Sequence, residues 1–88
     1  MATADYYVYI LKCADGTYYT GITTDPARRL QEHNAGTAAK YTHPPSRRPV
    51  EMIYTEEAGD RSNASKREYE IKQLTRKQKE GLMQKNRP

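Results

Sequence analysis

All the aromatic residues of this chain are tyrosines: it has eight Tyr, no Phe and no Trp among 88 residues. We expect a single domain over residues 1–88, with a core at about 6–85. A domain of this size buries only about 60–65% of its unfolded surface, and a buried tyrosine needs a partner for its hydroxyl. The sequence therefore predicts rings that lie partly in the core and partly on a functional surface, although tyrosine is also simply a good strand former.

The composition favours a polyanionic partner. Lys and Arg account for 15 residues, and the net charge is +4. Nucleic acid is the usual partner of a small basic domain, and a solvated basic surface is the alternative. Cys13 is the single cysteine, which excludes an intrachain disulfide and, with only two His, a four-ligand structural zinc site. The chain shows neither signal-peptide features nor an apolar run of the roughly 20 residues that span a membrane, so we expect a soluble, cytoplasmic protein.

Two strands are expected at the start of the chain, over Tyr6–Lys12 and Thr17–Thr23, because both segments are rich in β-forming residues. The turn between them allows two loops. A two-residue Asp-Gly turn places Tyr9 and Tyr19 on opposite faces, whereas a three-residue loop with Gly16 in the left-handed conformation places them on one face. The turn residues alone leave both loops open.

A helix is expected next, because Asp25 is a favourable N-cap and Pro26 is suited to the first turn. It should run to about Asn34 and end near Gly36. The order ββαβαα predicts a small α/β (α+β) domain with an antiparallel sheet. Residues 37–49 are expected to form a Pro-rich loop, followed by a third strand at Val50–Glu56 in which Val50, Met52 and Tyr54 alternate. A second helix is expected to be capped by Ser62 or Asn63 and to run to about Gln73. A third is expected to be capped by Thr75 and to run to about Lys85, with Leu82 and Met83 packed inward.

The first expected helix has an unusual composition for a small domain, because Leu30 is its only large hydrophobic residue. Arg29 and His33 are four residues apart and therefore project from the same face. A planar, always charged Arg is suited to bidentate contact with a phosphate. Arg28 points elsewhere, as a contact to a nucleic-acid backbone or as a solvated charge.

The second expected helix carries a carboxylate on its inward stripe. Glu68 follows Ala64 by four residues and precedes Ile71 by three. A carboxylate there is costly unless it is paired or binds a metal. The alternative is a surface pair with Lys72. Phosphodiester hydrolysis needs a base for the attacking water, a cation for the developing charge, and a metal ion or acid for the leaving oxygen.

Four short segments together resemble the GIY-YIG nuclease superfamily: YVYIL at 7–11, YTG at 19–21, RRLQEH at 28–33 and KRE at 66–68. The resemblance is nearest to small stand-alone bacterial members related to the structure-specific nuclease that resolves branched DNA. It implies the GIY-YIG fold, a three-stranded antiparallel sheet flanked by helices. It also implies that Tyr9 and Tyr19 share a face, and therefore selects the three-residue loop with Gly16 left-handed.

The same resemblance implies a set of catalytic residues. Glu68 holds Mg²⁺ or Mn²⁺, Arg29 stabilises the pentavalent charge, and Tyr19 orients water or phosphate. Tyr9, within reach of His33, helps to deprotonate the water, and we expect neighbouring cations to lower its pKa from the usual value of about 10. The expected catalytic residues are Tyr9, Tyr19, Arg29, His33 and Glu68.

The expected function is a divalent-metal-dependent endonuclease that acts on branched or otherwise irregular DNA in repair or recombination, with a protein partner for targeting. A nucleic-acid-binding module with little turnover, or an interaction subunit of a nuclease complex, is the alternative. The cations expected to contact the nucleic acid are Arg28, Lys40, Arg47 and Arg48.

Overall fold

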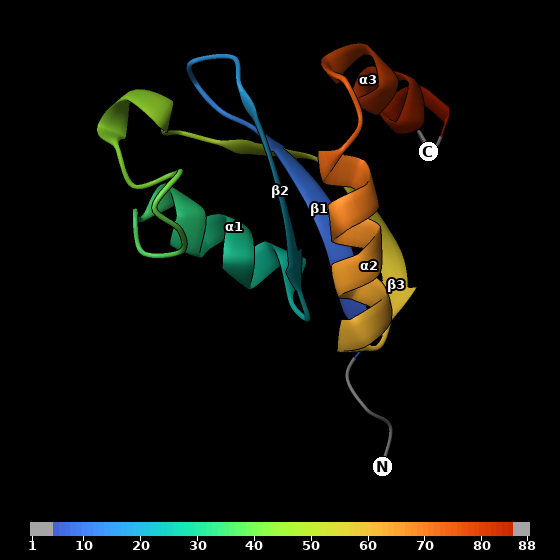
Figure 1. Cartoon of the computed structure of the whole chain (residues 1–88). Coiled ribbons are helices and arrows are strands. Elements are labelled where there is room, and N and C mark those ends of the chain that lie inside the picture. Colours follow the sequence, from blue (N-terminus) through green and yellow to red (C-terminus); the bar gives the residue numbers. More distant parts are fainter. Residues whose placement is uncertain (1–4, 86–88) are drawn as a thin grey trace.

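The computed structural model describes residues 5–85, which form one antiparallel sheet with helices on both of its faces (Figure 1). The predicted order ββαβαα is confirmed, with one short 3-10 turn in the Pro-rich loop. The elements are β1 (Tyr6–Lys12), β2 (Tyr18–Thr23), α1 (Pro26–Asn34), η1 (Pro45–Arg47), β3 (Glu51–Gly59), α2 (Arg61–Lys72) and α3 (Arg76–Lys85).

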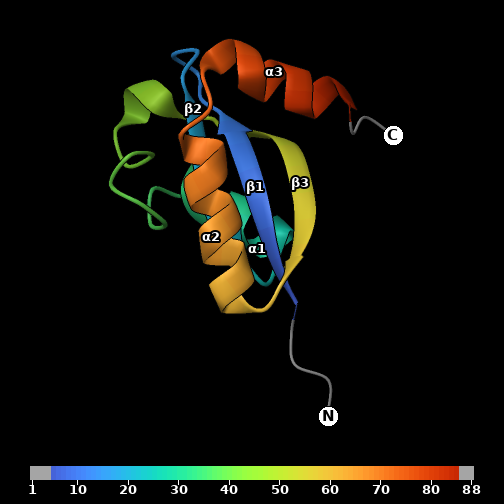
Figure 2. The same ribbon diagram turned by 45° about the vertical axis from the view of Figure 1, so that its right-hand side comes forward.

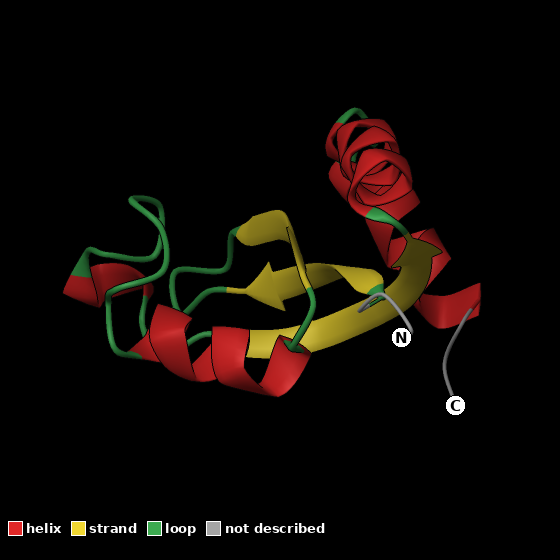
Figure 3. Cartoon of the chain, turned by 90° about the horizontal axis from the view of Figure 1, so that it is seen from below, coloured by secondary structure: helices red, strands yellow, loops and turns green. Residues whose placement is uncertain are grey.

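β1 is the central strand, because the strand order is β2-β1-β3 and both pairs are antiparallel. Its side chains alternate between two hydrophobic clusters. Val8 and Ile10 pack with residues of α2 and α3, whereas Tyr9 and Leu11 pack with α1 and the loop over 37–49. Figure 2 shows α2 in front of the sheet and α1 behind it, and the view from below in Figure 3 shows the strands between the helices.

The β1–β2 hairpin has the three-residue loop. The Cys13 amide donates to the Thr17 carbonyl (2.8 Å), and Gly16 has a φ of 87°, a conformation that glycine adopts without strain. The resulting register pairs Tyr9 with Gly21 and places Tyr19 two pairs further along, opposite Leu11, on the same face. The shared face of the two tyrosines, expected above, is confirmed.

Helix α1 begins and ends where the sequence predicts. The Asp25 side chain accepts from the Arg28 amide (3.1 Å), and Pro26 occupies the first turn. At the other end Gly36, with a φ of 80°, follows the C-cap and donates to the His33 carbonyl (3.1 Å). Both signals are local, so the sequence alone is sufficient to place this helix.

Strand β3 departs from the predicted alternation. Met52 pairs with Leu11, but Tyr54 pairs with Ile10, so a β-bulge at Ile53 adds one residue to β3. Met52 therefore faces the α1 side, and Tyr54 faces the α2 side. The strand also runs to Gly59, three residues beyond the predicted end.

Helix α2 is capped by Asp60, not by Ser62 or Asn63 as predicted. Gly59 turns the chain with a φ of 74°, and the Asp60 side chain then accepts from the Asn63 amide (2.8 Å). The predicted cap of α3 is confirmed, because Thr75 Oγ1 accepts from the Gln78 amide (3.2 Å). Leu82 and Met83 pack against the Val8 cluster, as expected.

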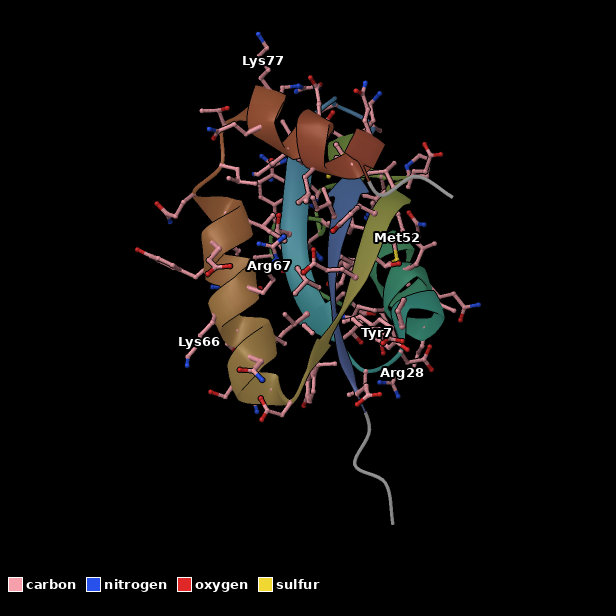
Figure 4. All side chains as sticks on the ribbon, turned by 90° about the vertical axis from the view of Figure 1, so that its right-hand side faces the viewer. Tyr7, Arg28, Met52, Lys66, Arg67 and Lys77 are labelled. Carbon is pink, nitrogen blue, oxygen red and sulfur yellow. The ribbon has the colours of Figure 1, made fainter. Side chains whose placement is uncertain are left out.

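The rotation of α2 about its axis is fixed by an ion pair between Arg67 and Glu56, on the side of the helix that faces the sheet. Arg67 donates from Nε (2.7 Å) and Nη2 (3.2 Å) to the Glu56 carboxylate of β3, which also accepts from the Tyr54 hydroxyl. Figure 4 shows Arg67 directed toward the sheet and Lys66 directed away from it. Successive residues lie about 100° apart around a helix, so Arg67 and Glu68 project from neighbouring sides of α2.

None of the helices within residues 5–85 combines the length and the apolar character that crossing a membrane requires.

Replacing Gly21 by Ala is expected to destabilise the fold. A Cβ at this position lies 2.6 Å from Tyr9 Oη and 2.7 Å from Tyr9 Cζ, and the Tyr9 ring is 1% exposed and cannot swing into solvent. Overpacking of this kind costs about 1–3 kcal/mol, measurable as the free energy of unfolding in urea.

Gly81→Ala is the matched control. A Cβ at Gly81 meets no atom within 4 Å. The free energy of unfolding of this variant should rise by about 0.5–1 kcal/mol, because alanine in a helix loses less conformational entropy on folding than glycine does. A Gly21→Ala protein as stable as the parent would contradict the close approach of Tyr9.

Candidate active site

The site is centred on the Tyr9 hydroxyl. Tyr9 projects from the middle of β1, its ring lies over Gly21 of β2, and its Oη lies 2.8 Å from His33 Nε2 of α1. This hydrogen bond is buried, and it joins residues 24 positions apart in the chain. Two of the predicted catalytic residues are therefore in direct contact.

His33 is fully buried and uses both ring nitrogens. Nε2 faces Tyr9, and Nδ1 lies 2.8 Å from Thr42 Oγ1 in the loop after α1. Burial lowers the pKa of His33 to about 4, and the charge of Arg29 contributes in the same direction. The imidazole is therefore neutral at pH 7 and can accept a proton.

Arg29 lies one helical turn before His33 and is one-third exposed, at 32% of its side chain. Its Nη1 donates to Glu32 (3.1 Å), and its Nη2 donates to the Ala38 carbonyl (3.3 Å). Burial lowers its pKa, but interactions with Tyr9 and Glu32 raise the pKa by more. The Nε–H is buried without a hydrogen-bond partner among the described residues. A charged guanidinium with an unused donor is suited to an anion.

The expected lowering of the Tyr9 pKa is wrong. Burial raises the pKa of Tyr9 to about 12, and the opposing interaction with Arg29 does not compensate. The nearby Tyr19 and Glu68 also raise it, because a phenolate is disfavoured beside other negative groups. Tyr9 is therefore a protonated hydrogen-bond donor at neutral pH.

Tyr19 closes the site from the side of β2. Its ring centroid lies 5.2 Å from that of His33 and 6.4 Å from that of Tyr9. Its other neighbour is Tyr41, stacked at 5.7 Å, and the Arg47 guanidinium lies 4.0 Å from the Tyr41 ring centroid. This aromatic column connects the buried centre to the outer surface of the loop.

Glu68 approaches from the opposite face of the sheet, on α2. Its side chain is 23% exposed and forms an ion pair with Lys72 (3.5 Å), the pairing that the sequence offered as the alternative to a metal. Its charge also raises the pKa of Tyr9. Within residues 5–85 no group of three His, Cys, Asp or Glu side chains could hold a metal. A single hard oxygen donor fits Mg²⁺, which usually keeps several waters and takes substrate phosphates as ligands.

The cations predicted to contact nucleic acid differ in their exposure and in the hydrogen bonds that hold them. Arg28 is 61% exposed, on a different side of α1 from Arg29, and lies 4.0 Å from Glu32. Lys40 is exposed. Arg47 donates to Asp15 (3.2 Å) and to the Tyr41 carbonyl (3.0 Å), and Arg48 donates to the carbonyls of Asn34 (3.3 Å) and His43 (2.9 Å). Both arginines hold the loop in place, and their role as phosphate contacts stays a prediction.

Two residues of the site were not found from the sequence. Thr42, which contacts His33, is a threonine in an irregular loop, and no local pattern distinguishes it. Tyr41, which stacks on Tyr19, had one available signal, since it is an aromatic residue among the cations of a loop.

Three comparisons with known proteins bear on this geometry. A family model described as the GIY-YIG catalytic domain matches residues 5–81. A UPF0213 protein of Enterococcus faecalis is 59% identical over 75 residues, which cover 85% of each chain. Another, of Halobacterium salinarum, is 56% identical over 77 residues, covering 88% of this chain and 97% of the relative.

Solved structures give the same result for the fold. The solution NMR structure of the E. faecalis protein EF2693 matches with a TM-score of 0.63 and 53% identity, covering 94% of this chain and 86% of that one. That of the UPF0213 protein BH0048 of Bacillus halodurans matches with a TM-score of 0.59 and 43% identity, covering 93% and 85%.

The buried neutral His33 predicts a pH dependence of stability. Its pKa is about 4 in the folded chain and 6.5 when unperturbed. The contribution of the neutral imidazole to the free energy of unfolding is therefore complete above pH 6.5. It is lost as the pH falls toward 4, because the unfolded chain then binds a proton that the folded chain does not. The loss should be about 3 kcal/mol, measured by urea unfolding across this range.

His33→Gln serves as the reference, because it lacks the titrating group while still offering hydrogen-bonding atoms. Its unfolding free energy should change much less between pH 6.5 and pH 4. Parallel curves for the two proteins would show that His33 is not the group responsible.

Proposed function

Because the chain belongs to the GIY-YIG family of catalytic domains, a family of nucleases, we propose that it is a divalent-metal-dependent endonuclease that hydrolyses phosphodiester bonds of DNA. One observation carries this proposal. Groups from β2, α1 and α2 all act on the Tyr9 hydroxyl of β1: His33 by a hydrogen bond of 2.8 Å, and Arg29, Tyr19 and Glu68 by their effect on its pKa.

The proton path in this proposal runs from water through Tyr9 to His33. A phenol with a pKa of about 12 is protonated at neutral pH, so it can take a proton from water only as it gives up its own. His33 Nε2, at 2.8 Å, is positioned to receive that proton. The pair therefore acts as one base, with His33 as the final acceptor.

Arg29 links substrate binding to this base. It is a cation with an unused buried donor, and it is also one cause of the low pKa of His33, second to burial. When a phosphate pairs with the guanidinium, the positive charge near His33 is partly neutralised. The proposal is that bound DNA raises the basicity of His33 and places a donor against the developing negative charge.

Glu68 is the proposed ligand of Mg²⁺ or Mn²⁺, and the ion when bound supplies Lewis-acid stabilisation of the leaving oxygen. The support is chemical: a carboxylate that is 23% exposed on an otherwise buried stripe, held by one ion pair with a lysine. Lys72 is half exposed, at 49% of its side chain, and can move aside at little cost.

Branched or otherwise irregular DNA, in repair or recombination, is the substrate class we propose, and a partner protein is proposed to supply targeting. Both rest on the resemblance of the motifs. Cleavage rates on branched, single-stranded and duplex DNA of the same sequence test the first part. The buried, free Cys13 supports a cytoplasmic setting, where thiols stay reduced.

A nucleic-acid-binding module without turnover is the second candidate function. Two observations favour it: Tyr9 is 1% exposed, and its pKa is raised and not lowered. The same basic surface would serve binding alone. Single-turnover cleavage with excess protein and Mg²⁺ separates the two, since a binding module leaves the DNA intact at saturation.

Glu68→Gln should abolish metal-dependent cleavage and leave the fold intact. A Lewis acid at the phosphate contributes several kcal/mol, so the single-turnover rate should fall at least about a hundredfold. The lost Lys72 pair is half exposed and should cost only about 0.3–0.5 kcal/mol of stability.

Glu70→Gln is the matched control on the same helix. Glu70 pairs with Arg67 at 3.3 Å and is 64% exposed, so its loss should leave the cleavage rate unchanged. If Glu68→Gln cuts at the rate of Glu70→Gln, Glu68 is an ion-pair residue and not a metal ligand.

Arg29→Ala and Arg28→Ala should affect different steps, the first the cleavage rate and the second the affinity for DNA. Removing Arg29 should cost about a hundred- to a thousandfold in rate, the usual effect of a donor aimed at transition-state charge, with DNA binding in Ca²⁺ largely retained. Removing Arg28 should weaken binding modestly and keep the rate. The Arg29 variant should also raise the pKa of His33, which NMR titration measures without DNA. A larger rate loss for Arg28→Ala would refute the assignment.

A further inference from the structure

We propose that Thr42 is a positioning residue that fixes the tautomer of His33, so that Nε2 is held as the acceptor for the Tyr9 proton. The catalytic consequence rests on the proposed function, but the tautomer itself is a property of the protein without DNA. Sequence reasoning assigned Thr42 no role.

The argument starts from the single proton of a threonine hydroxyl. Thr42 is fully buried, and its Oγ1 lies 3.4 Å from the Ala39 carbonyl and 2.8 Å from His33 Nδ1. A carbonyl can only accept, so the hydroxyl is the donor in the contact with Ala39. With Nδ1–H as the donor to the Thr42 oxygen, the hydrogens of Thr42, His33 and Tyr9 each have one acceptor, whereas a hydroxyl that donated to Nδ1 would leave the Tyr9 hydrogen without an acceptor on His33.

The other ring nitrogen follows from the first. The pKa of His33 is about 4, so the ring is neutral at pH 7 and carries one N–H. With that hydrogen on Nδ1, Nε2 presents a lone pair to Tyr9 Oη at 2.8 Å. Tyr9 therefore donates to His33.

The opposite tautomer would break the proton path. An Nε2–H would donate to Tyr9 Oη, and the phenolic hydrogen would lose its acceptor on His33. The charged and titratable groups that act on this pair are Arg29 and Glu32 of α1, Tyr19 of β2 and Glu68 of α2. Among the described residues the two ring nitrogens of His33 are hydrogen-bonded to Tyr9 and Thr42, so Thr42 decides which ring nitrogen carries the hydrogen.

The loop holds Thr42 in place without the help of its hydroxyl. Tyr41, its neighbour, stacks on Tyr19 at 5.7 Å, and the Tyr41 carbonyl accepts from Arg47 Nη1 at 3.0 Å. Arg48 ties the same loop to α1 through the Asn34 carbonyl (3.3 Å). The hydroxyl can therefore be removed by Thr42→Val, which keeps the shape, and retained by Thr42→Ser.

The test is ¹⁵N NMR of the imidazole nitrogens at neutral pH in the protein alone. The chain has two histidines, so His43→Gln, a change in the exposed loop, leaves only the His33 signals. The parent and Thr42→Ser should show a protonated Nδ1 and an unprotonated Nε2, and Thr42→Val should show a mixture or a shift to Nε2–H. An Nε2–H tautomer in the parent overturns the proposal, even if Thr42→Val fails to fold.

Cleavage provides the second measurement. Thr42→Val should lower the single-turnover rate about ten- to a hundredfold, part of the usual contribution of acid–base catalysis, with DNA binding in Ca²⁺ unchanged. Thr42→Ser should stay within about threefold of the parent. A parent that does not cleave refutes the proposed function but not the tautomer, whereas a Thr42→Val protein with the parent's tautomer refutes the role of Thr42.

Discussion

The buried hydrogen bond between Tyr9 and His33 is the contact on which the rest of this small structure depends. It joins the central strand to α1 across 24 residues, and both partners are almost fully buried. A buried polar pair is stable only when its hydrogen-bonding capacity is used. Thr42 supplies the second partner of the imidazole. Gly21 leaves room for the Tyr9 hydroxyl, because a Cβ there would lie 2.6 Å from it. The hydrophobic cluster that contains Tyr9 thus encloses a polar centre.

The sheet brings two separate faces to this centre. β2 is an edge strand, and its residue opposite Tyr9 is a glycine. Arg29 of α1, on one face of the sheet, and Glu68 of α2, on the other, both act on the Tyr9 phenol. Arg67 fixes the rotation of α2 through Glu56, and the charge of the next residue, Glu68, raises the pKa of Tyr9. A salt bridge to β3 therefore helps to position a carboxylate that acts on the phenol.

Burial and charge act in opposite directions within the site. The cation Arg29 stabilises a phenolate, but burial outweighs it and the pKa of Tyr9 rises to about 12. The same burial lowers the pKa of His33 to about 4. The two shifts leave both groups neutral at pH 7. When Tyr9 gives its proton to His33 and takes one from water, the positive charge forms on the imidazole and no phenolate accumulates. A phenol whose pKa is too high for it to ionise at pH 7 can therefore still take part in proton transfer.

The sequence by itself determined the elements and most of the residues that meet at the site. Asp25 and Pro26 start α1, Gly36 ends it, and the turn at Gly16 permits the shared face of Tyr9 and Tyr19. These signals act over one to four residues, so the short segment that contains them is sufficient to read them.

Only the tertiary structure decided the rest. The bulge at Ile53 reverses the facing of Tyr54, Asp60 takes the cap of α2, and Thr42 meets His33 from an irregular loop. The sign of the Tyr9 shift also came from the fold. Neighbouring charge can be read from motif spacing, but desolvation depends on which distant segments cover the ring, and no local pattern records that.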